Sequence, residues 1–352
     1  MKTYLVTGGA GFIGSNFVLY LLRNYDDIRL VNVDKLTYAG NLGNLAEADG
    51  DGRHVFVRAD ICDTAAMDAL FERYKPEFVV NFAAESHVDR SIQSPGVFAQ
   101  TNVLGTVTLL NAARKTWERP EGSYREDVRF LQVSTDEVYG SLPLDDATAF
   151  FREDTPLNPR SPYAASKASA DMFVKAYGDT YGMPVNITRC SNNYGPRQFP
   201  EKLIPRAIVC ALRHEKIPVY GDGRNVRDWL FVDDHCRAID AVLQKASAGE
   251  VYNIGSHNER ANIDIVRHII AELADMTGDA QIDEGLIEYV PDRKGHDRRY
   301  AIAPDKIAHD LGWKPETPFE AGIAGTIRWY LANEQWVEHV LGEEHGNANK
   351  RS

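Results

Sequence analysis

The chain has 352 residues, a net charge of −12 and a hydrophobic content of 43%. At roughly 150 residues per domain this length predicts about two domains, with enough apolar surface for a core that needs no disulfide or metal support. The acidic balance argues against broad binding to nucleic acid or to anionic lipid. The four cysteines and ten histidines form no metal-binding spacing, so we expect reduced thiols and no metal ion.

The N-terminus and the apolar runs predict a cytoplasmic protein. A strand pattern begins within the first ten residues and leaves no room for a signal peptide. No apolar run reaches the ~18 residues that cross a bilayer. We therefore expect no membrane partner.

The first half of the chain alternates short apolar strands with helices, which predicts an α/β fold with a Rossmann-type, doubly wound parallel sheet. The segment 78–83 is almost wholly apolar, as expected for a strand that is covered on both faces. Strands are expected at 4–7, 28–33, 55–57, 78–83, 128–133 and 185–189, and helices at 12–22, 65–74, 97–115 and 162–181.

The second half is less regular and predicts a smaller substrate lobe that is interleaved with the last strands of the sheet. Helices are expected at 203–214, 233–246, 263–276 and 319–341, and strands at 218–220 and 251–254. We assign the dinucleotide-binding domain to residues 1–185 plus about 228–258, and the substrate domain to about 186–227 and 259–341. Residues 342–352 are polar and aperiodic, which predicts a flexible tail.

A glycine-rich turn joins the first strand to the first helix. Gly8, Gly11 and Gly14 permit a tight turn and let backbone N–H groups approach a pyrophosphate at the helix N-terminus. Asp34 ends the second strand, where a carboxylate accepts hydrogen bonds from the adenosine ribose and repels a 2′-phosphate. The pattern predicts NAD rather than NADP, with Asp60 as a candidate for the adenine edge. An aspartate in a turn is the alternative for both carboxylates.

A tyrosine and a lysine share one face of the helix 162–181. Four residues separate Tyr163 from Lys167, which places both side chains on the same side. An ammonium group and a positively charged nicotinamide nearby favour the phenolate form of tyrosine. Tyr163 could then take a proton from a sugar hydroxyl while hydride leaves the carbon.

Two carboxyl groups follow the strand 128–133, at the edge where the active crevice of a parallel sheet forms. Thr135 can orient a substrate, which is all that simple alcohol oxidation needs. The adjacent Asp136 and Glu137 suggest further chemistry, in which one removes a carbon-bound proton and the other protonates a leaving hydroxyl. Such roles require unequal environments. A solvated acidic turn is the alternative.

These motifs together resemble the extended short-chain dehydrogenases, and most closely the dTDP-glucose 4,6-dehydratases, over residues 1 to about 313. Related epimerases lack the acidic pair, so the Thr-Asp-Glu triplet discriminates between them. The supporting segments are 8–14, 83–89, 134–140, 163–167, 192–196, 199–205, 221–229 and 295–299.

The resemblance implies a three-step conversion of dTDP-glucose to dTDP-4-keto-6-deoxyglucose with NAD as cofactor. Tyr163, helped by Thr135, would oxidise C4. Glu137 would remove the C5 proton while Asp136 protonates the departing C6 hydroxyl, and hydride would return to C6. The resemblance also implies a homodimer built on the helices 97–115 and 162–181.

Site contacts carry over from the family position by position, and an ordinary surface residue is the alternative for each. Tyr220 would pack on the base and Arg227 would lie beside the diphosphate, since a guanidinium donates two hydrogen bonds at once. Cofactor contacts would come from Gly8, Gly11, Phe12, Ile13, Gly14, Asp34, Lys35, Thr37, Asp60, Ile61, Ala83, Ala84, Ser86, Thr101, Tyr163, Lys167 and Asn193. Substrate contacts would come from Ser86, Thr135, Asn192, Lys202, Leu203, Pro218, Tyr220, Arg227, Asn262, Asp292, Arg293 and His296.

Other functions stay open on the same motifs. A 4,6-dehydratase of another nucleotide sugar, a 4-epimerase or a decarboxylase would share the glycines, Tyr163 and Lys167. An NAD-responsive regulator is a further alternative, although a binding module needs no acid–base set. Arg197 and Lys294 depart from the family pattern and could alter loop stiffness or sugar-nucleotide preference.

Overall fold

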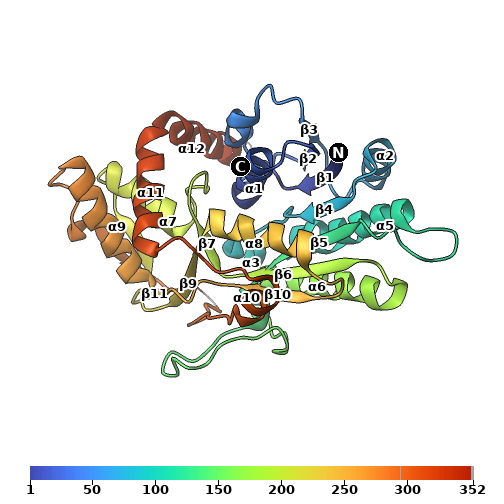
Figure 1. Ribbon diagram of the computed structural model, residues 1–352. Coiled ribbons are helices and arrows are strands. Elements are labelled where there is room, and N and C mark those ends of the chain that lie inside the picture. The colour runs from blue at the N-terminus through green and yellow to red at the C-terminus, as the bar shows by residue number, and fades with distance from the viewer. Residues whose placement is uncertain (294, 350–352) are drawn as a thin grey trace.

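A parallel sheet forms the centre of the larger lobe (Figure 1). The computed structural model describes residues 1–293 and 295–349. Within them, seven strands pair in the order β10-β6-β5-β4-β1-β2-β3, and every pairing is parallel. The predicted doubly wound sheet is confirmed. Its strands are β1 (Lys2–Thr7), β2 (Ile28–Asp34), β3 (His54–Arg58), β4 (Phe78–Asn81), β5 (Arg129–Thr135), β6 (Val185–Cys190) and β10 (Val251–Ile254).

Helices cover both faces of this sheet because its strands carry apolar side chains on both. Tyr4 and Val6 of β1 pack in one core with Phe17, whereas Leu5 packs in a second core with Phe71. Successive side chains of a strand point to opposite faces, so both faces need a cover. The first face carries α1 (Phe12–Asn24), α8 (Val232–Lys245) and α10 (Asp305–Leu311), and the second carries α2 (Thr64–Tyr74), α5 (Gly105–Trp117) and α6 (Pro162–Tyr181).

The smaller lobe has a core of its own, in which Ile208, Ile269 and Ile323 are fully buried. Its helices lie at the left of Figure 1, away from α2 and α5 at the right. The helices are α7 (Leu203–Leu212), α9 (Asn262–Thr277), α11 (Phe319–Ala332) and α12 (Glu334–Asn349). Its strands are β7 (Asn192–Tyr194), β9 (Val226–Phe231) and β11 (Glu259–Ala261), which pair in the order β11-β9-β7, and β8 (Ile217–Tyr220), which pairs with β12 (Ile287–Val290).

The chain passes repeatedly between the two lobes, as the predicted interleaving requires. It enters the smaller lobe at β7, returns with α8 and β10, leaves again at β11, and returns with α10. The sheets shift two of the expected boundaries. Cys190 of β6 still pairs with Thr135 of β5 in the large sheet, whereas β9 pairs with β7 and β11 in the small one. By strand pairing, the stretch 186–190 belongs to the large sheet and 228–231 to the small one, although Leu230 packs in the core of the larger lobe.

Two expected long helices are divided. The segment 97–115 consists of α4 (Pro95–Phe98), a π-helical stretch at Ala99–Leu104, and α5. The segment 319–341 breaks at Asn333, which leaves the helical region with φ −127° and ψ 41°. A periodic sequence pattern reveals neither a π-helical stretch within a helix nor a break at one residue. The other short elements are α3 (Val88–Gln93), η1 (Leu42–Ala48), η3 (Asp136–Tyr139) and η4 (Glu284–Leu286).

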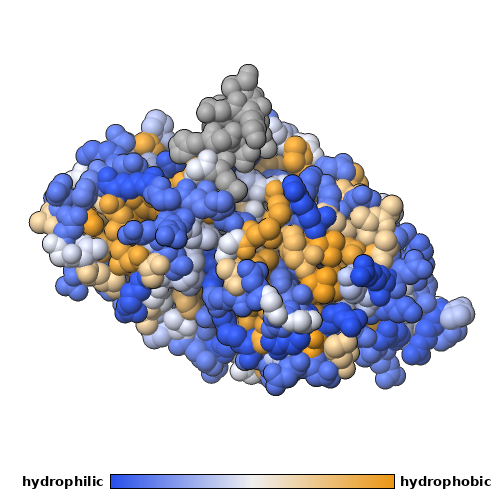
Figure 2. Space-filling view, turned by 90° about the horizontal axis from the view of Figure 1, so that it is seen from above, coloured by the Kyte–Doolittle hydropathy of each residue, from blue (hydrophilic) through white to orange (hydrophobic). Residues whose placement is uncertain are grey.

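Helix α12 continues to Asn349, through most of the stretch expected to form a flexible tail. Residues 350–352 and Lys294 lie outside the described residues. The four cysteines are free thiols. Within the described chain, no helix is long and apolar enough to cross a bilayer. Seen from above, the surface is largely hydrophilic, with apolar residues exposed in separate areas (Figure 2).

Candidate active site

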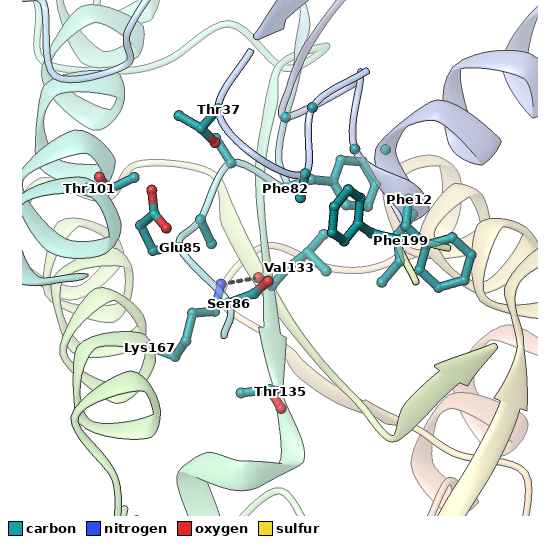
Figure 3. A pocket seen from close by; sticks show the side chains of 18 of the residues that line it. Phe12, Thr37, Phe82, Glu85, Ser86, Thr101, Val133, Thr135, Lys167 and Phe199 are labelled. Carbon is teal, nitrogen blue, oxygen red and sulfur yellow. Dashed lines mark hydrogen bonds between the residues drawn. The ribbon is translucent and has the colours of Figure 1, made fainter. Parts of the chain in front are cut away.

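A cleft opens at the carboxyl ends of β1 and β4, the two strands at which the strand order reverses. From β1 the chain proceeds to β2 and β3 on one side, and β4 and β5 then follow on the other. Loops diverge at such a reversal and leave a crevice between them. Every residue that the sequence assigns to the cofactor lines this cleft. Figure 3 shows Phe12 and Phe199 on one side of the cleft, and Thr101, Glu85 and Lys167 on the other.

The glycine loop has the shape that a pyrophosphate requires. Gly8 has a φ of 69°, and a Cβ atom on Gly14 would lie 2.2 Å from the carbonyl oxygen of Gly8. Helix α1 begins at Phe12, and none of the described side chains caps it. The backbone N–H groups of its first turn therefore have no intrahelical acceptor and are open to an anion. The loop fits the diphosphate of a dinucleotide.

The charges at the ends of β2 and β3 favour NAD. The Asp34 carboxylate accepts hydrogen bonds from the backbone N–H groups of Ala10, at 3.0 Å, and Leu36, at 2.8 Å. Burial raises the pKa of Asp34, and these bonds oppose the rise. The ammonium of Lys35 lies 2.5 Å from Asp60 Oδ2, so its charge is paired rather than available to a 2′-phosphate.

Tyr163 and Lys167 lie buried in the first turns of α6. Ser161 caps this helix by accepting a hydrogen bond from the N–H of Ala164 at 3.1 Å, and Pro162 occupies its first position. Lys167 Nζ donates to the carbonyl oxygen of Val133 in β5 at 2.7 Å, the dashed line in Figure 3. Both side chains thus line the cofactor cleft at the end of β5.

The expectation that an ammonium group and a bound nicotinamide favour the phenolate of Tyr163 stays a prediction, and burial acts against it. Burial raises the pKa of Tyr163 well above its usual value, and the charge of Glu137 adds to the rise. Burial also lowers the pKa of Lys167, whose ammonium is turned toward a strand carbonyl. A low-dielectric site disfavours both charged forms. Tyr163 therefore stays a neutral phenol until a bound positive charge compensates the phenolate.

The Thr-Asp-Glu triplet turns sharply where β5 ends. Thr135 is the last residue of the strand and caps η3, since its Oγ1 accepts a hydrogen bond from the N–H of Glu137 at 3.3 Å. The same hydroxyl donates to Asp136 Oδ1 at 3.3 Å. Asp136 is only 1% exposed, and its Oδ2 has no hydrogen-bond partner among the described residues. The solvated acidic turn considered for this segment is therefore excluded.

The two carboxyl groups occupy unequal electrostatic environments. Burial and the neighbouring charge of Glu137 raise the pKa of Asp136 well above its usual value. Burial also raises the pKa of Glu137, but Arg227 and Lys202 oppose that rise. Burial thus disfavours the charged form of both carboxyl groups and Arg227 favours it in both, but the charge of Glu137 acts against ionisation of Asp136, whereas Lys202 favours ionisation of Glu137. Separated pKa values in adjacent carboxyl groups are typical of an acid and a base that work together.

A second pocket adjoins the first at Glu137, Asn192, Glu201 and Lys202, which line both. Asp292 lies outside the described lining, but its Oδ1 atom contacts His296 Nδ1 at 2.6 Å. Of the predicted substrate contacts, Ser86 and Thr135 line the first pocket, and Leu203, Pro218, Tyr220, Arg227, Asn262, Arg293 and His296 line the second.

The second pocket combines a flat ring with cations. The Tyr220 ring is 39% exposed, and the Arg293 guanidinium lies 5.1 Å from its centroid. Arg227 is buried and donates to the carbonyl oxygen of Asp297 at 2.9 Å. Asn262 Oδ1 is buried without a hydrogen-bond partner among the described residues. The pocket thus offers a stacking surface, positive charge and an unused acceptor, which suits a nucleotide.

Sequence reasoning missed a polar group at the junction of the pockets. Glu201 has a side chain only 7% exposed, accepts a hydrogen bond from Tyr38 at 3.2 Å, and lies 3.5 Å from His87 Nε2. His87 and Glu201 belong to two motifs of the family resemblance, but nothing in their spacing indicates that they meet. Arg197, by contrast, lies outside the described linings and donates to Asn16 Oδ1 at 3.1 Å.

Comparison with known proteins agrees with this geometry. The sequence model of the family described as GDP-mannose 4,6 dehydratase matches residues 5–326. A dTDP-glucose 4,6-dehydratase of Xanthomonas campestris pv. campestris (strain B100) is 55% identical over 343 residues, 97% of this chain and 96% of the relative. The crystal structure of dTDP-glucose 4,6-dehydratase from Bacillus anthracis str. Ames in complex with NAD is 47% identical, with a TM-score of 0.85 over 97% of this chain and 100% of that one.

An epimerase is similar at a greater distance. UDP-glucose 4-epimerase from Thermotoga maritima, solved with UDP-glucose, is 30% identical, with a TM-score of 0.82 over 95% of this chain and 100% of that one. The parallel sheet, the glycine loop and the Tyr163–Lys167 helix define the class of the extended short-chain dehydrogenases/reductases. Within that class, the chain belongs to the family of the dTDP-glucose 4,6-dehydratases.

Proposed function

We propose that this protein uses NAD to convert dTDP-glucose to dTDP-4-keto-6-deoxyglucose. The observation that carries the proposal is the pair of adjacent carboxyl groups that lies beside Tyr163. Asp136 is buried and Glu137 is partly buried, and the pKa of each is raised. Curated relatives of that name at 50–55% identity support the same donor and reaction. An epimerase exchanges hydride at C4 without eliminating water, and so has no use for such a pair.

The chain offers a candidate residue for each chemical step. Tyr163 takes the proton of the C4 hydroxyl, and Thr135 orients that hydroxyl. Bound NAD supplies a hydride acceptor, and its positive ring offsets the charge of a phenolate. The C5 proton becomes acidic beside the new carbonyl group, and Glu137, whose charged form Lys202 and Arg227 stabilise, removes it.

Elimination of water needs an acid that is still protonated at neutral pH. Asp136 meets that need because burial and the charge of Glu137 hold its proton. It would protonate the C6 hydroxyl as water leaves. The hydride taken from C4 would then return to C6, and Glu137 would return its proton to C5, which completes the 4-keto-6-deoxy sugar. The nucleotide would lie in the second pocket, with its base on Tyr220 and its diphosphate near Arg227 and Arg293.

The test is incubation of the purified protein with the dTDP-, UDP-, CDP- and GDP-activated forms of glucose, followed by mass spectrometry. We expect the dTDP sugar to lose one water and to form a keto sugar that absorbs in strong base. An unchanged mass with inverted C4 would indicate an epimerase, and loss of carbon dioxide from a uronic acid donor would indicate a decarboxylase. No dehydration of any of the sugars would refute the proposal.

We further propose that the chain forms a homodimer through α6 and the neighbouring helices. Met172 and Phe173 on α6 are 53% and 42% exposed, and Leu104 on the adjoining π-helical stretch is 52% exposed. Large apolar side chains gathered on adjacent helices are typical of a protein interface. A second copy would bury them in the antiparallel manner of a helix bundle.

Light scattering during gel filtration tests the assembly. The wild-type protein should elute as a dimer and Phe173→Glu as a monomer, since a buried unpaired carboxylate opposes association. Tyr289→Glu is the matched control, because Tyr289 is 55% exposed on β12 in the other lobe. A wild-type monomer, or an intact Phe173→Glu dimer, would contradict this interface.

A further inference from the structure

Three aromatic side chains meet where α11 gives way to α12. The Trp329 ring centroid lies 5.1 Å from that of Tyr330 and 4.9 Å from that of Trp336, and each pair is edge-on. This group, the aromatic corner, is separate from the described linings of both pockets. Its contacts nevertheless lead into the cofactor cleft.

One hydrogen-bonded path runs from Trp336 to the glycine loop. Trp336 Nε1 donates to Asn44 Oδ1 at 2.8 Å. Asn44 lies in η1 and is 2% exposed, and its Nδ2 donates to the carbonyl oxygen of Ala10 at 2.8 Å. The N–H of Ala10 in turn donates to Asp34 Oδ2 at 3.0 Å. The C-terminal helix is thus connected to the loop and to the carboxylate that form the cofactor site.

A second path reaches another part of the same cleft. The hydroxyl of Tyr330 donates to the carbonyl oxygen of Gln198. Gln198 Nε2 donates to the carbonyl oxygen of Asn193 at 3.0 Å, and both residues line the cofactor cleft. The aromatic corner therefore contacts one lining residue, Gln198, directly, and reaches the glycine loop through Asn44.

The hydrogen bonds along the first path set the orientation of the Asn44 side-chain amide. The amide has a donor end, used by Ala10, and an acceptor end, used by Trp336. Without the indole N–H of Trp336, Asn44 Oδ1 would be a buried acceptor with no donor. The free-energy cost of that unpaired acceptor exceeds the net stabilisation that the hydrogen bond contributes. Any shift of the Asn44 side chain that relieves this cost would loosen its bond to the Ala10 carbonyl oxygen, and the backbone N–H of Asn41, at 3.0 Å, would then be the remaining donor to that oxygen. A glycine-rich loop that loses such an anchor must be ordered again whenever a ligand binds.

We propose that Trp336 is a positioning residue for the cofactor, which holds the glycine loop in its binding conformation through Asn44. The inference rests on the proposed function, because a dehydratase uses the same cofactor molecule twice per turnover and must retain it between the two hydride transfers. The aromatic corner, which lies outside the cleft, would help the protein to retain the cofactor by holding the glycine loop in place.

The test compares the wild-type protein with its variants after the cofactor has been stripped from the full-length chain. NAD binding is measured by calorimetry and by the rate of exchange of labelled NAD. Trp336→Phe keeps an aromatic ring but loses the N–H, and we expect its dissociation constant to rise roughly threefold to tenfold. At saturating NAD, kcat and the KM for dTDP-glucose should return to wild-type values. Because a ligand of the folded state also offsets general destabilisation, a matched control variant separates loop positioning from that effect.

Trp313→Phe is the matched control. Its indole N–H donates to the carbonyl oxygen of Asp234 at 3.1 Å and is equally lost, but this acceptor belongs to α8 and not to η1. We expect wild-type NAD affinity in this variant. An equal loss of NAD affinity in Trp313→Phe would show that loss of any buried indole hydrogen bond weakens NAD binding, and would overturn the proposal.

A double variant tests the path itself. Because Trp336 acts only through Asn44, Trp336→Phe should add nothing to the loss caused by Asn44→Ala. Multiplied effects, or wild-type affinity in either single variant, would refute the inference. If Trp336→Phe does not fold, the Asn44→Ala variant alone still tests the proposal. Unchanged NAD affinity in Asn44→Ala would refute the connection through Asn44. NAD binding is measured without a sugar nucleotide, so failure of the dehydratase assignment would be seen separately.

Discussion

Replacement of Glu137 by glutamine should separate oxidation of the sugar from loss of water. Gln is nearly isosteric and keeps the volume at the pocket junction, but it cannot accept the C5 proton. General base catalysis contributes about 10²–10⁴-fold. At 1.36 kcal/mol per tenfold change, the elimination barrier should therefore rise by roughly 3–5 kcal/mol. The oxidation step, which uses Tyr163 and Thr135, should continue.

The assay is stopped-flow absorbance of enzyme-bound NADH after mixing with dTDP-glucose. The variant should accumulate up to one equivalent of NADH per site, with little keto-deoxy product. Glu153→Gln is the control, because Glu153 is also partly buried and its Oε1 accepts the N–H of Asn253 at 2.9 Å, outside both described linings. Product formation by Glu137→Gln within about threefold of the wild-type rate would refute its role as the base.

Three further outcomes follow from the geometry. Tyr163→Phe should lower kcat by about 10²–10⁴-fold with NAD affinity unchanged by equilibrium dialysis, and near-normal turnover would remove it as the proton acceptor. Gly14→Ala would place a Cβ atom 2.2 Å from Gly8 O, a backbone atom that cannot turn aside, so calorimetry should show at least roughly tenfold weaker NAD binding. The raised pKa of Asp136 means that the folded state binds the Asp136 proton more tightly than the unfolded chain does. This proton binding stabilises the folded state fully at pH values below the usual carboxyl pKa. The stabilisation is lost as the pH rises through the folded-state pKa. Asp136→Asn should therefore be more stable than wild type in alkaline urea titrations and catalytically defective. An unchanged difference in stability across pH would contradict the raised pKa.

Much of the cofactor site was predictable because it is encoded over short distances. The spacing of Gly8, Gly11 and Gly14 suffices to form a strand–turn–helix, and the four-residue interval between Tyr163 and Lys167 suffices to place them on one helical face. The protonation of Tyr163 was not predictable in the same way. Its pKa depends on burial and on Glu137, and the degree of burial exists only once the chain has folded.

The sequence alone determined the sheet class, the phosphate loop and the residues with acid–base chemistry, because local spacing sets each of them. Only the tertiary structure decided the electrostatic environment of the two acids, since Arg227 and Lys202 reach Glu137 from other elements. It also decided that Trp336 binds Asn44, a residue almost the whole chain away. Contacts between distant segments depend on how the lobes pack, and packing is a property of all the side chains together.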